Sequence, residues 1–265
     1  MQKIWVCGAR GQIGQAVNDV VDKLEFEMLD TDVDDLDVTD TDEVLRFGEM
    51  NRPDIIINCS GMTDISSCEE NPSQAFKVNA LGARNLAIVA AKMQAKMVQL
   101  STDDVFDGKS TEPYTEFDIT NPGTVYGKSK LAGENYVKEF TTKHFIVRST
   151  WVYGKGQNFI NGFLKKVDAG EQLSIASDQF GSPTSANELA RFLLHLVHTS
   201  EYGTYHATNK GVCSRYAFAQ EILKMTGKTA SMQPVPTVMS DFSKVRPAYA
   251  VLDNFIMSMV PIYDF

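Results

Sequence analysis

The stretch Lys3-Ile4-Trp5-Val6-Cys7-Gly8-Ala9-Arg10-Gly11-Gln12-Ile13-Gly14 decides the fold of this 265-residue chain. It begins with a short apolar run that ends at a glycine, which is the pattern of a buried strand. Residues 11–24 then carry apolar side chains at helical spacing, and residues 26–29 predict a second strand. The three glycines therefore lie in the turn between a strand and a helix. Glycine permits a tight turn there, and the free NH groups of the helix start attract an anion.

The rest of the first 150 residues repeats this alternation. Apolar runs predict three further strands, at residues 54–59, 96–101 and 144–148. Helical spacing and capping residues predict the intervening helices, at residues 40–50, 72–92 and 125–140. Strands that alternate with helices of this length indicate an α/β protein with a doubly wound parallel sheet of the Rossmann kind.

The alternation becomes less regular after residue 150, where Gly, Asn and Gln gather. The pattern still predicts helices at 159–168 and 186–198, a strand at 173–176, and a returning strand at 204–207. We therefore expect a Rossmann domain over residues 1–150, to which residues 183–208 return. Residues 151–182 and 209–265 would form a smaller C-terminal lobe that binds a substrate.

Composition narrows the class of protein further. The net charge is −9, and residues 30–43 are acidic without a basic residue among them, so the chain is a poor partner for nucleic acid. No apolar run approaches the length of a membrane span, and the chain start does not read as a secretory signal. The four cysteines form no Cys-x-x-Cys pair, which favours reduced thiols and a cytoplasmic protein.

The glycine turn and the acidic residue beyond it match the pattern that binds a nicotinamide dinucleotide. Asp30, at the end of the second strand, could hydrogen-bond the adenosine ribose. Arg10, within the turn, could pair with a 2′-phosphate, which the carboxylate of Asp32 would repel. These signals oppose each other, so the sequence predicts NADPH or NADH without choosing between them.

Two residues on the helix at 125–140 point to proton transfer. Tyr126 and Lys130 are one helical turn apart and share a face of that helix. An ammonium group near a phenol favours the phenolate, and such a tyrosine can pass a proton to the oxygen of a ketone as hydride reaches its carbon. The hydroxyl of Thr102, after the fourth strand, could hold that oxygen.

Together these features resemble the extended short-chain dehydrogenase/reductase family, and within it the dTDP-4-dehydrorhamnose reductases. The matching stretches span most of the chain in family order: residues 8–14, 53–58, 101–103, 125–134, 148–153 and 178–184. The resemblance implies reduction of a nucleotide-linked 4-keto-6-deoxy sugar, most simply dTDP-4-dehydrorhamnose to dTDP-L-rhamnose. It also implies Tyr126 as proton donor, Lys130 as ligand of the nicotinamide ribose, and Thr102 as the group that binds the carbonyl.

The resemblance and the glycine turn together define the expected site. The cofactor-binding set comprises Gly8, Arg10, Gly11, Gln12, Ile13, Gly14, Asp30, Asp37, Val38, Ser60, Gly61, Thr63, Tyr126 and Lys130. The substrate-binding set comprises Asp103, Asp104, Trp151, Asn158 and Arg246.

One departure from the family pattern leaves other functions open. These reductases usually carry tyrosine where Asp104 stands, whereas the related sugar-nucleotide 4,6-dehydratases carry Thr-Asp-Glu. Thr102-Asp103-Asp104 falls between the two patterns, so a dehydratase or an epimerase of the same superfamily is an alternative. A third alternative is a regulatory subunit that binds the cofactor without turnover, like that of methionine adenosyltransferase.

Metal chemistry and oligomeric state are less well defined by the sequence. Some relatives dimerise around a magnesium ion, but the corresponding positions here are Ala16 and Asn187, which are poor ligands, so we expect no metal. His195 and His198 lie one turn apart in a leucine-rich helix, which favours packing over zinc binding. The chain also ends at Phe265, earlier than its relatives, and a homodimer is compatible with the sequence.

Overall fold

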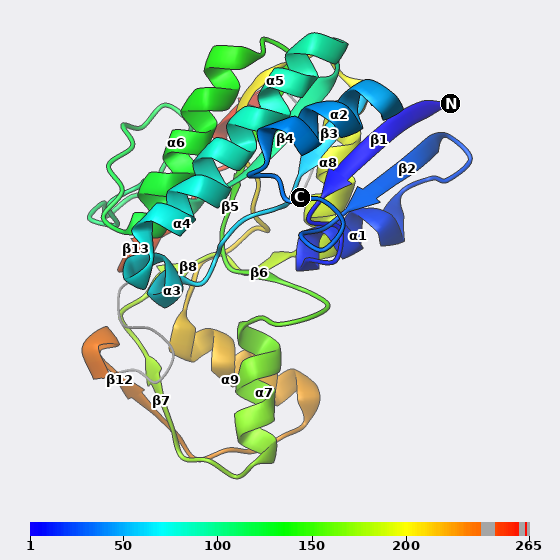
Figure 1. The fold of residues 1–265 in the computed structure, drawn as a ribbon. Helices are drawn as coiled ribbons and strands as arrows, with labels where there is room; N and C mark the ends of the chain where they lie inside the picture. Colours follow the sequence, from blue (N-terminus) through cyan, green and yellow to red (C-terminus); the bar gives the residue numbers. More distant parts are fainter. Residues whose placement is uncertain (240–246, 260–262, 264–265) are drawn as a thin grey trace.

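The computed structural model describes residues 1–239, 247–259 and 263. Its centre is a six-stranded sheet in the order β10-β5-β4-β3-β1-β2, and every neighbouring pair is parallel (Figure 1). The strands are β1 (Gln2–Cys7), β2 (Phe26–Thr31), β3 (Ile55–Asn58), β4 (Lys96–Thr102), β5 (His144–Ser149) and β10 (Gly203–His206). The predicted doubly wound parallel sheet is confirmed, including the return of the chain to add β10 beside β5.

Helices cover both faces of this sheet because successive strand residues point to opposite sides. Trp5 and Cys7 of β1 pack on one face, and Ile4 and Val6 pack on the other. The first face carries α2 (Thr41–Asn51), α5 (Ala83–Met93) and α6 (Val125–Phe140), and the second carries α1 (Gln12–Val20) and α8 (Ala186–His198).

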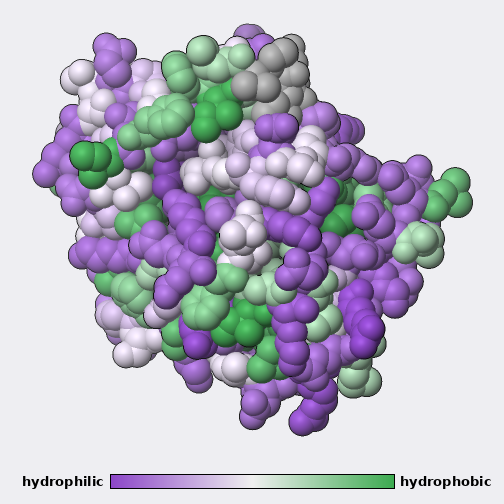
Figure 2. Space-filling model, turned by 90° about the horizontal axis from the view of Figure 1, so that it is seen from above, coloured by the Kyte–Doolittle hydropathy of each residue, from purple (hydrophilic) through white to green (hydrophobic). Residues whose placement is uncertain are grey.

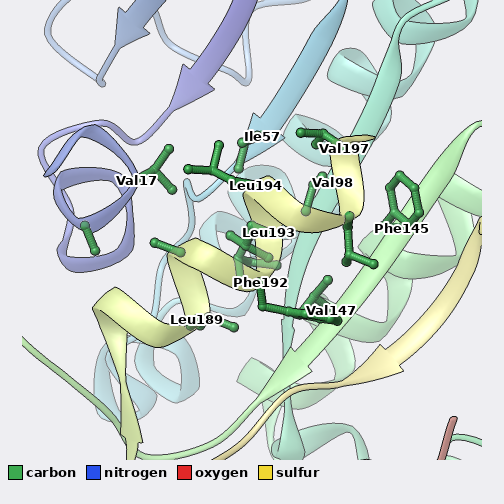
Figure 3. Close-up of a cluster of buried hydrophobic side chains, with 14 of the residues drawn as sticks. Val17, Ile57, Val98, Phe145, Val147, Leu189, Phe192, Leu193, Leu194 and Val197 are labelled. Carbon is green, nitrogen blue, oxygen red and sulfur yellow. The ribbon is translucent and has the colours of Figure 1, made fainter. Parts of the chain in front are cut away.

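Helix α8 supplies much of the core on the second face. Leu189, Phe192 and Leu193 are fully buried, and Figure 3 shows them beside the strand residues Val98 and Val147. Helix α8 begins after Ser185, whose side chain accepts a hydrogen bond from the backbone of Glu188, as the helix start requires. The helix predicted at 186–198 therefore forms within its predicted bounds.

The helix predicted at 72–92 forms and runs to Met93, but a π-helical turn interrupts its α-helical pattern. The segment consists of α4 (Pro72–Phe76), the π-turn η1 (Lys77–Gly82) and α5, and a further helix, α3 (Ile65–Glu70), precedes it. Within the π-turn, Asn79 Oδ1 accepts from the backbone NH of Met62 (2.8 Å), and its Nδ2 donates to Met62 O (2.9 Å) and Ser129 Oγ (2.9 Å). These bonds join the π-turn to the loop after β3 and to helix α6. π-turns inside helices are frequent at functional sites.

A smaller lobe lies below the sheet in the view of Figure 1. It contains α7 (Phe159–Asp168) and α9 (Arg215–Thr226), which enclose Phe163, Ala219 and Ile222 against β7 (Leu173–Ala176), the parallel partner of β12 (Met232–Val235). Several short strands join the lobe to the sheet domain: β6 (Val152–Tyr153), β8 (Phe180–Gly181), β9 (Thr184–Ser185), β11 (Cys213–Ser214) and β13 (Tyr249–Ala250).

The last described segment returns to the sheet domain. Leu252 forms a bridge with Tyr114, and α10 (Phe255–Met259) buries Met257 in the core cluster that contains α8. The structure therefore places part of the 209–265 segment on the Rossmann domain rather than in the lobe.

Figure 2 shows a face on which hydrophilic residues predominate and hydrophobic ones lie in small separate groups. Among the helices that the structure describes, none is both long enough and apolar enough to cross a membrane.

A buried polar network ties β5, β10 and α6 together. Glu134 on α6 accepts from Arg148 on β5 through both oxygens (Nε–Oε1 2.9 Å, Nη2–Oε2 2.7 Å). Arg148 Nη1 lies 3.5 Å from His206 Nε2, and His206 Nδ1 donates to the carbonyl oxygens of Tyr114 (3.0 Å) and Asp253 (3.1 Å). His206 is thus neutral, with its proton on Nδ1.

The network makes folding stability depend on pH through His206. Burial, reinforced by the charge of Arg148, lowers the pKa of His206 to about 3 in the folded protein. Below pH ~6.5 this histidine is therefore protonated in the unfolded chain but stays neutral in the folded one. This contribution to stability is full above pH ~6.5 and is lost as the pH falls towards 3. We expect the free energy of unfolding in urea to fall by roughly 2 kcal/mol more between pH 7 and pH 5 in the wild type than in His206→Asn. Equal slopes for the two proteins would contradict this assignment.

Candidate active site

The glycine turn lies at the switch point of the sheet, where the connections from β1 and β3 leave in opposite directions. Ligands of open α/β sheets bind in this crevice, beyond the carboxyl ends of the strands. Gly8 has φ +75°, and a Cβ built on it would lie 2.8 Å from the backbone nitrogen of Ser60. A Cβ on Gly14 would lie 2.3 Å from Gly8 O, so both positions require glycine. The turn is therefore a backbone cradle of the kind that fits a dinucleotide pyrophosphate at the start of α1.

A pocket of about 550 Å³ continues from the cradle along the end of β2. Its lining includes the two residues predicted to lie beside the adenine, Asp37 and Val38, together with others of the predicted cofactor-binding set: Gly8, Arg10, Gly11, Ser60 and Gly61. Asp30 is exposed and lies outside this lining, so its predicted place at the ribose is corrected. The backbone NH groups of Gly8 and Ala9 donate to the carbonyl of Thr31, and the acidic side chains that line the pocket are Asp32, directly after β2, and Asp37.

The guanidinium of Arg10 is held among carboxylates. Its Nη2 lies 3.1 Å from Asp34 Oδ2 and 3.4 Å from Asp35 Oδ2, and its backbone NH donates to Asp32 (2.9 Å). Ion pairs this exposed contribute little each, so a 2′-phosphate could displace them while meeting the repulsion of the same three aspartates.

This arrangement predicts a small, selective effect of Arg10→Ala. The KM for NADPH should rise by up to about fivefold and the KM for NADH should change little, because only the phosphate would lose a partner. Steady-state kinetics with both cofactors at low and high salt measure the effect. An unchanged KM for NADPH would show that Arg10 has no phosphate role.

A second pocket of about 430 Å³ adjoins the first and shares Gly11, Cys59, Ser60 and Gly61 with it. It collects most of the other predicted site residues: Gln12, Ile13, Thr63, Thr102, Asp103, Tyr126, Lys130, Trp151 and Asn158. The structure therefore brings residues from the first turn of α1, the end of β4, helix α6 and the start of the lobe to one cavity.

Helix α6 presents Tyr126 and Lys130 to this pocket. The helix begins after Thr124, whose side chain accepts from the backbone NH of Gly127 (2.9 Å), so Tyr126 lies in the first turn. Burial lowers the pKa of Lys130 to about 8, and the charge of Glu134, one turn further on, opposes that effect. Lys130 Nζ approaches the turn after β3, at 3.7 Å from a Cβ built on Gly61. The lysine thus stands between the tyrosine's helix and the cofactor cradle.

The two aspartates after Thr102 are not equivalent. Asp103 lines the pocket but accepts hydrogen bonds from Thr102 Oγ1 (2.8 Å) and Thr150 Oγ1 (2.7 Å). Asp104 is 1% exposed and lies close enough to Cys68 for its charge to add, after desolvation and the larger effects of Asp64 and Glu69, to that thiol's raised pKa. The prediction that Asp104 contacts substrate is therefore wrong, since the short turn η2 (Asp103–Val105) directs the two carboxyls to different places. The adjacent acid–base pair that a dehydratase needs is not formed in the pocket.

Asn158, which lines the pocket, also has a local structural role. Its side chain caps α7, accepting from the backbone NH of Asn161 (3.1 Å), and its Nδ2 donates to Gln12 Oε1 (3.0 Å). Gln12 Nε2 in turn donates to the carbonyl of Val152 (3.0 Å). The cofactor turn and the lobe are thus joined directly at the mouth of the pocket.

The sequence reasoning missed Arg215, Phe159 and Phe218. Arg215 lines the pocket with its guanidinium carbon 3.4 Å from the ring centre of Trp151 and 4.9 Å from that of Phe159. Phe218, one turn along α9, completes this wall. No local pattern could have signalled Arg215, because the segment that carries Trp151 and Phe159 is far from it in the chain.

Two other expectations concern residues away from the pocket. Arg246, predicted to hold the nucleotide, lies outside the described residues. Across residues 1–239, 247–259 and 263, no group of three or more His, Cys, Asp or Glu side chains is placed to hold a metal ion.

Comparison with known proteins identifies the family. Residues 1–261 match the family described as RmlD substrate binding domain. The chain belongs to this family. A crystal structure of a dTDP-4-dehydrorhamnose reductase from Clostridium acetobutylicum is 41% identical with a TM-score of 0.95, and the match covers 98% of this chain and 93% of that one.

Two further relatives support the assignment. The dTDP-4-dehydrorhamnose reductase of Bacillus anthracis in complex with NADP is 36% identical with a TM-score of 0.94, over 98% of this chain and 93% of that one. The spore coat polysaccharide biosynthesis protein SpsK of Bacillus subtilis is 35% identical over 255 residues, covering 96% of this chain and 90% of that protein. The predicted membership of the extended short-chain dehydrogenase/reductases, and of the dTDP-4-dehydrorhamnose reductases within them, is confirmed.

Proposed function

We propose that this member of the family reduces the ketone of a nucleotide-linked 4-keto-6-deoxy sugar with NADPH or NADH, converting dTDP-4-dehydrorhamnose to dTDP-L-rhamnose. One observation carries the proposal: Thr102, Tyr126, Lys130 and Trp151 line a single pocket that shares its wall with the dinucleotide cradle. A ketone bound in that pocket would lie next to a proton donor and next to the nicotinamide end of a cofactor bound in the cradle.

The mechanism follows from the order of these groups. A bound reduced nicotinamide supplies a hydride to the carbonyl carbon. Tyr126 donates its phenolic proton to the carbonyl oxygen as the negative charge develops there, and the hydroxyl of Thr102 hydrogen-bonds the same oxygen. The protonated Lys130 favours the phenolate that Tyr126 leaves behind. The hydride and the proton together turn the ketone into an alcohol.

The lobe provides the contacts for the rest of the substrate. Trp151 offers an aromatic face to the sugar, and the neighbouring guanidinium of Arg215 suits the pyrophosphate, because guanidinium groups pair well with phosphate oxygens. Asn158 would act at one remove, by holding the pocket mouth through Gln12. A nucleotide sugar would thus span from the cofactor cradle to α9.

The cysteines indicate the compartment in which the enzyme works. All four cysteines are free thiols in the structure, which fits a reducing compartment, and we place the reaction in the cytoplasm. A homodimer stays a prediction, which the mass of the purified protein in solution would test.

A direct assay tests the function. The purified protein is mixed with dTDP-4-dehydrorhamnose and NADPH, then NADH, and loss of absorbance of the reduced nicotinamide is followed while the sugar product is identified. We expect stoichiometric cofactor oxidation and dTDP-L-rhamnose. Cofactor binding without oxidation would instead support a regulatory subunit. Conversion of dTDP-glucose to its 4-keto-6-deoxy product without net cofactor use would support a dehydratase.

A further inference from the structure

Asp103 makes two hydrogen bonds that take no part in the proposed mechanism. Its carboxylate is 4% exposed, and each oxygen accepts from a different threonine: Oδ1 from Thr102 (2.8 Å) and Oδ2 from Thr150 (2.7 Å). Thr102 ends β4 and Thr150 follows β5, two neighbouring strands of the sheet. The carboxylate therefore joins the strand end that carries the carbonyl-binding hydroxyl to the strand end that leads into the lobe.

The residue after Thr150 is Trp151, and its backbone is unusual. Its φ is +46°, in the left-handed region that a bulky aromatic residue seldom adopts. Such a conformation persists only where the surroundings hold it. On the side-chain end the holding contacts are the guanidinium of Arg215 and the backbone at Gly181, where a Cβ would lie 2.5 Å from the indole. On the backbone end, Trp151 O accepts from the backbone NH of Thr184 (3.2 Å), and the side chain of the preceding Thr150 donates to Asp103.

We propose that Asp103 is a positioning residue that sets both walls of the reaction pocket: it orients the Thr102 hydroxyl and holds the Thr150–Trp151 turn that presents the indole to the sugar. Asp103 itself donates nothing to the substrate. The inference rests on the proposed function for its kinetic consequences, but its structural half does not depend on the substrate.

The chemistry of the hydroxyl explains how Asp103 acts on Thr102. Thr102 Oγ1 accepts from the backbone NH of Asp104 (3.2 Å) and donates its single proton to Asp103. When a ketone oxygen arrives, that proton turns from the carboxylate to the ketone. Without the carboxylate, Thr102 Oγ1 would lose the side-chain partner that holds it at the pocket wall, which would slow the step that needs it.

The two threonines separate the two effects. Thr150→Val keeps the shape of the side chain and removes only the hydroxyl, so it should loosen Trp151 and leave Thr102 paired with Asp103. We expect the KM for the sugar nucleotide to rise about tenfold, which is the loss of one hydrogen bond to a charged group, with kcat and the KM for NADPH within about twofold of wild type. Thr150→Ser, which restores a hydroxyl, should return the KM towards wild type. Asp103→Asn removes one acceptor and should lower kcat as well.

A spectroscopic signal reports the position of Trp151 without any turnover. The chain has two tryptophans, Trp5 and Trp151, so the difference between each variant and its counterpart carrying Trp151→Phe isolates the second indole. Near-ultraviolet circular dichroism and fluorescence of this difference should change in Thr150→Val and Asp103→Asn, and recover in Thr150→Ser. Thr141→Val is the matched control, since Thr141 is also buried (6% exposed) but ends helix α6 far from the pocket.

The outcomes distinguish this inference from the proposed function. A wild-type KM and an unchanged Trp151 signal in both Thr150→Val and Asp103→Asn would overturn the positioning role. If Thr150→Val does not fold, Asp103→Asn and Thr150→Ser decide the positioning role through the same Trp151 signal. If the wild-type enzyme reduces no sugar nucleotide, the proposed function fails, whereas the Trp151 signal still decides whether Asp103 holds the turn.

Discussion

Tyr126→Phe should lower kcat for the sugar nucleotide by roughly 10²–10⁴-fold, the usual contribution of a positioned acid or base. Phenylalanine keeps the ring that packs at the start of α6 and removes only the hydroxyl, so the fold and the cofactor cradle should be unaffected. The KM values for both substrates should therefore stay within a few fold of wild type. Removing an interaction that forms only in the transition state lowers kcat and kcat/KM together.

Tyr136, another tyrosine of helix α6, provides a matched control. It lies on the same helix outside the lining of the pocket and packs near Phe140, so Tyr136→Phe should keep full activity. Activity is measured as oxidation of NADPH, and cofactor affinity is measured separately by quenching of protein fluorescence. A Tyr126→Phe enzyme with more than about a tenth of wild-type kcat would exclude this tyrosine as the proton donor.

The predicted site residues Thr102, Tyr126 and Lys130 line one pocket in the structure because their positions follow from local rules. A residue at the end of a parallel strand must lie at the carboxyl edge of the sheet, which places Thr102. Residues four apart on a helix must share a face, which places Tyr126 and Lys130 together. The spacing of residues 125–140 also fixed that face, because the predicted helix has the observed bounds.

The features that the sequence did not predict correctly are those that depend on contacts between distant parts of the chain. The π-turn around Asn79 depends on hydrogen bonds to Met62 and Ser129, which helical periodicity does not reveal. Asp30 was expected at the ribose because it ends the apolar strand, but the glycine turn closes on the residue after it and brings Asp32 to the pocket. Arg215 meets Trp151 only because the lobe folds back on the sheet. These contacts are tertiary, so no local pattern predicts them.

The second large effect concerns the buried pair of Glu134 and Arg148. Both side chains are almost fully buried, and the charge and hydrogen bonds of Arg148, with a bond from Ser101 Oγ (2.5 Å), outweigh burial and lower the pKa of Glu134. Glu134→Gln would leave the guanidinium buried without its counter-charge. We expect the free energy of unfolding to fall by about 3–5 kcal/mol, the usual cost of removing one partner of a buried pair. Urea denaturation followed by circular dichroism measures it.

Three comparisons test whether the loss comes from the orphaned charge. Lys138→Gln removes only the half-exposed lysine 3.6 Å from Glu134 and should cost less than about 0.5 kcal/mol. Glu134→Leu combined with Arg148→Met should cost less than Glu134→Gln alone, since no unpaired charge remains. The stabilisation should persist above pH ~4.3 and disappear as the pH falls through the lowered pKa of Glu134. A double variant as unstable as the single one would assign the loss to packing instead.

The same substitution should reach the active site, because Glu134 stands one turn beyond Lys130. Burial lowers the pKa of Lys130 to about 8, and the negative charge of Glu134 prevents a larger decrease. In Glu134→Gln that support is gone, so Lys130 should lose its proton at a lower pH. If a protonated Lys130 favours the Tyr126 phenolate, the alkaline limb of the kcat profile must then move to lower pH. The network that supports the fold would in this way also set the pH range in which Lys130 is protonated. An unchanged alkaline limb would show that the two roles are separate.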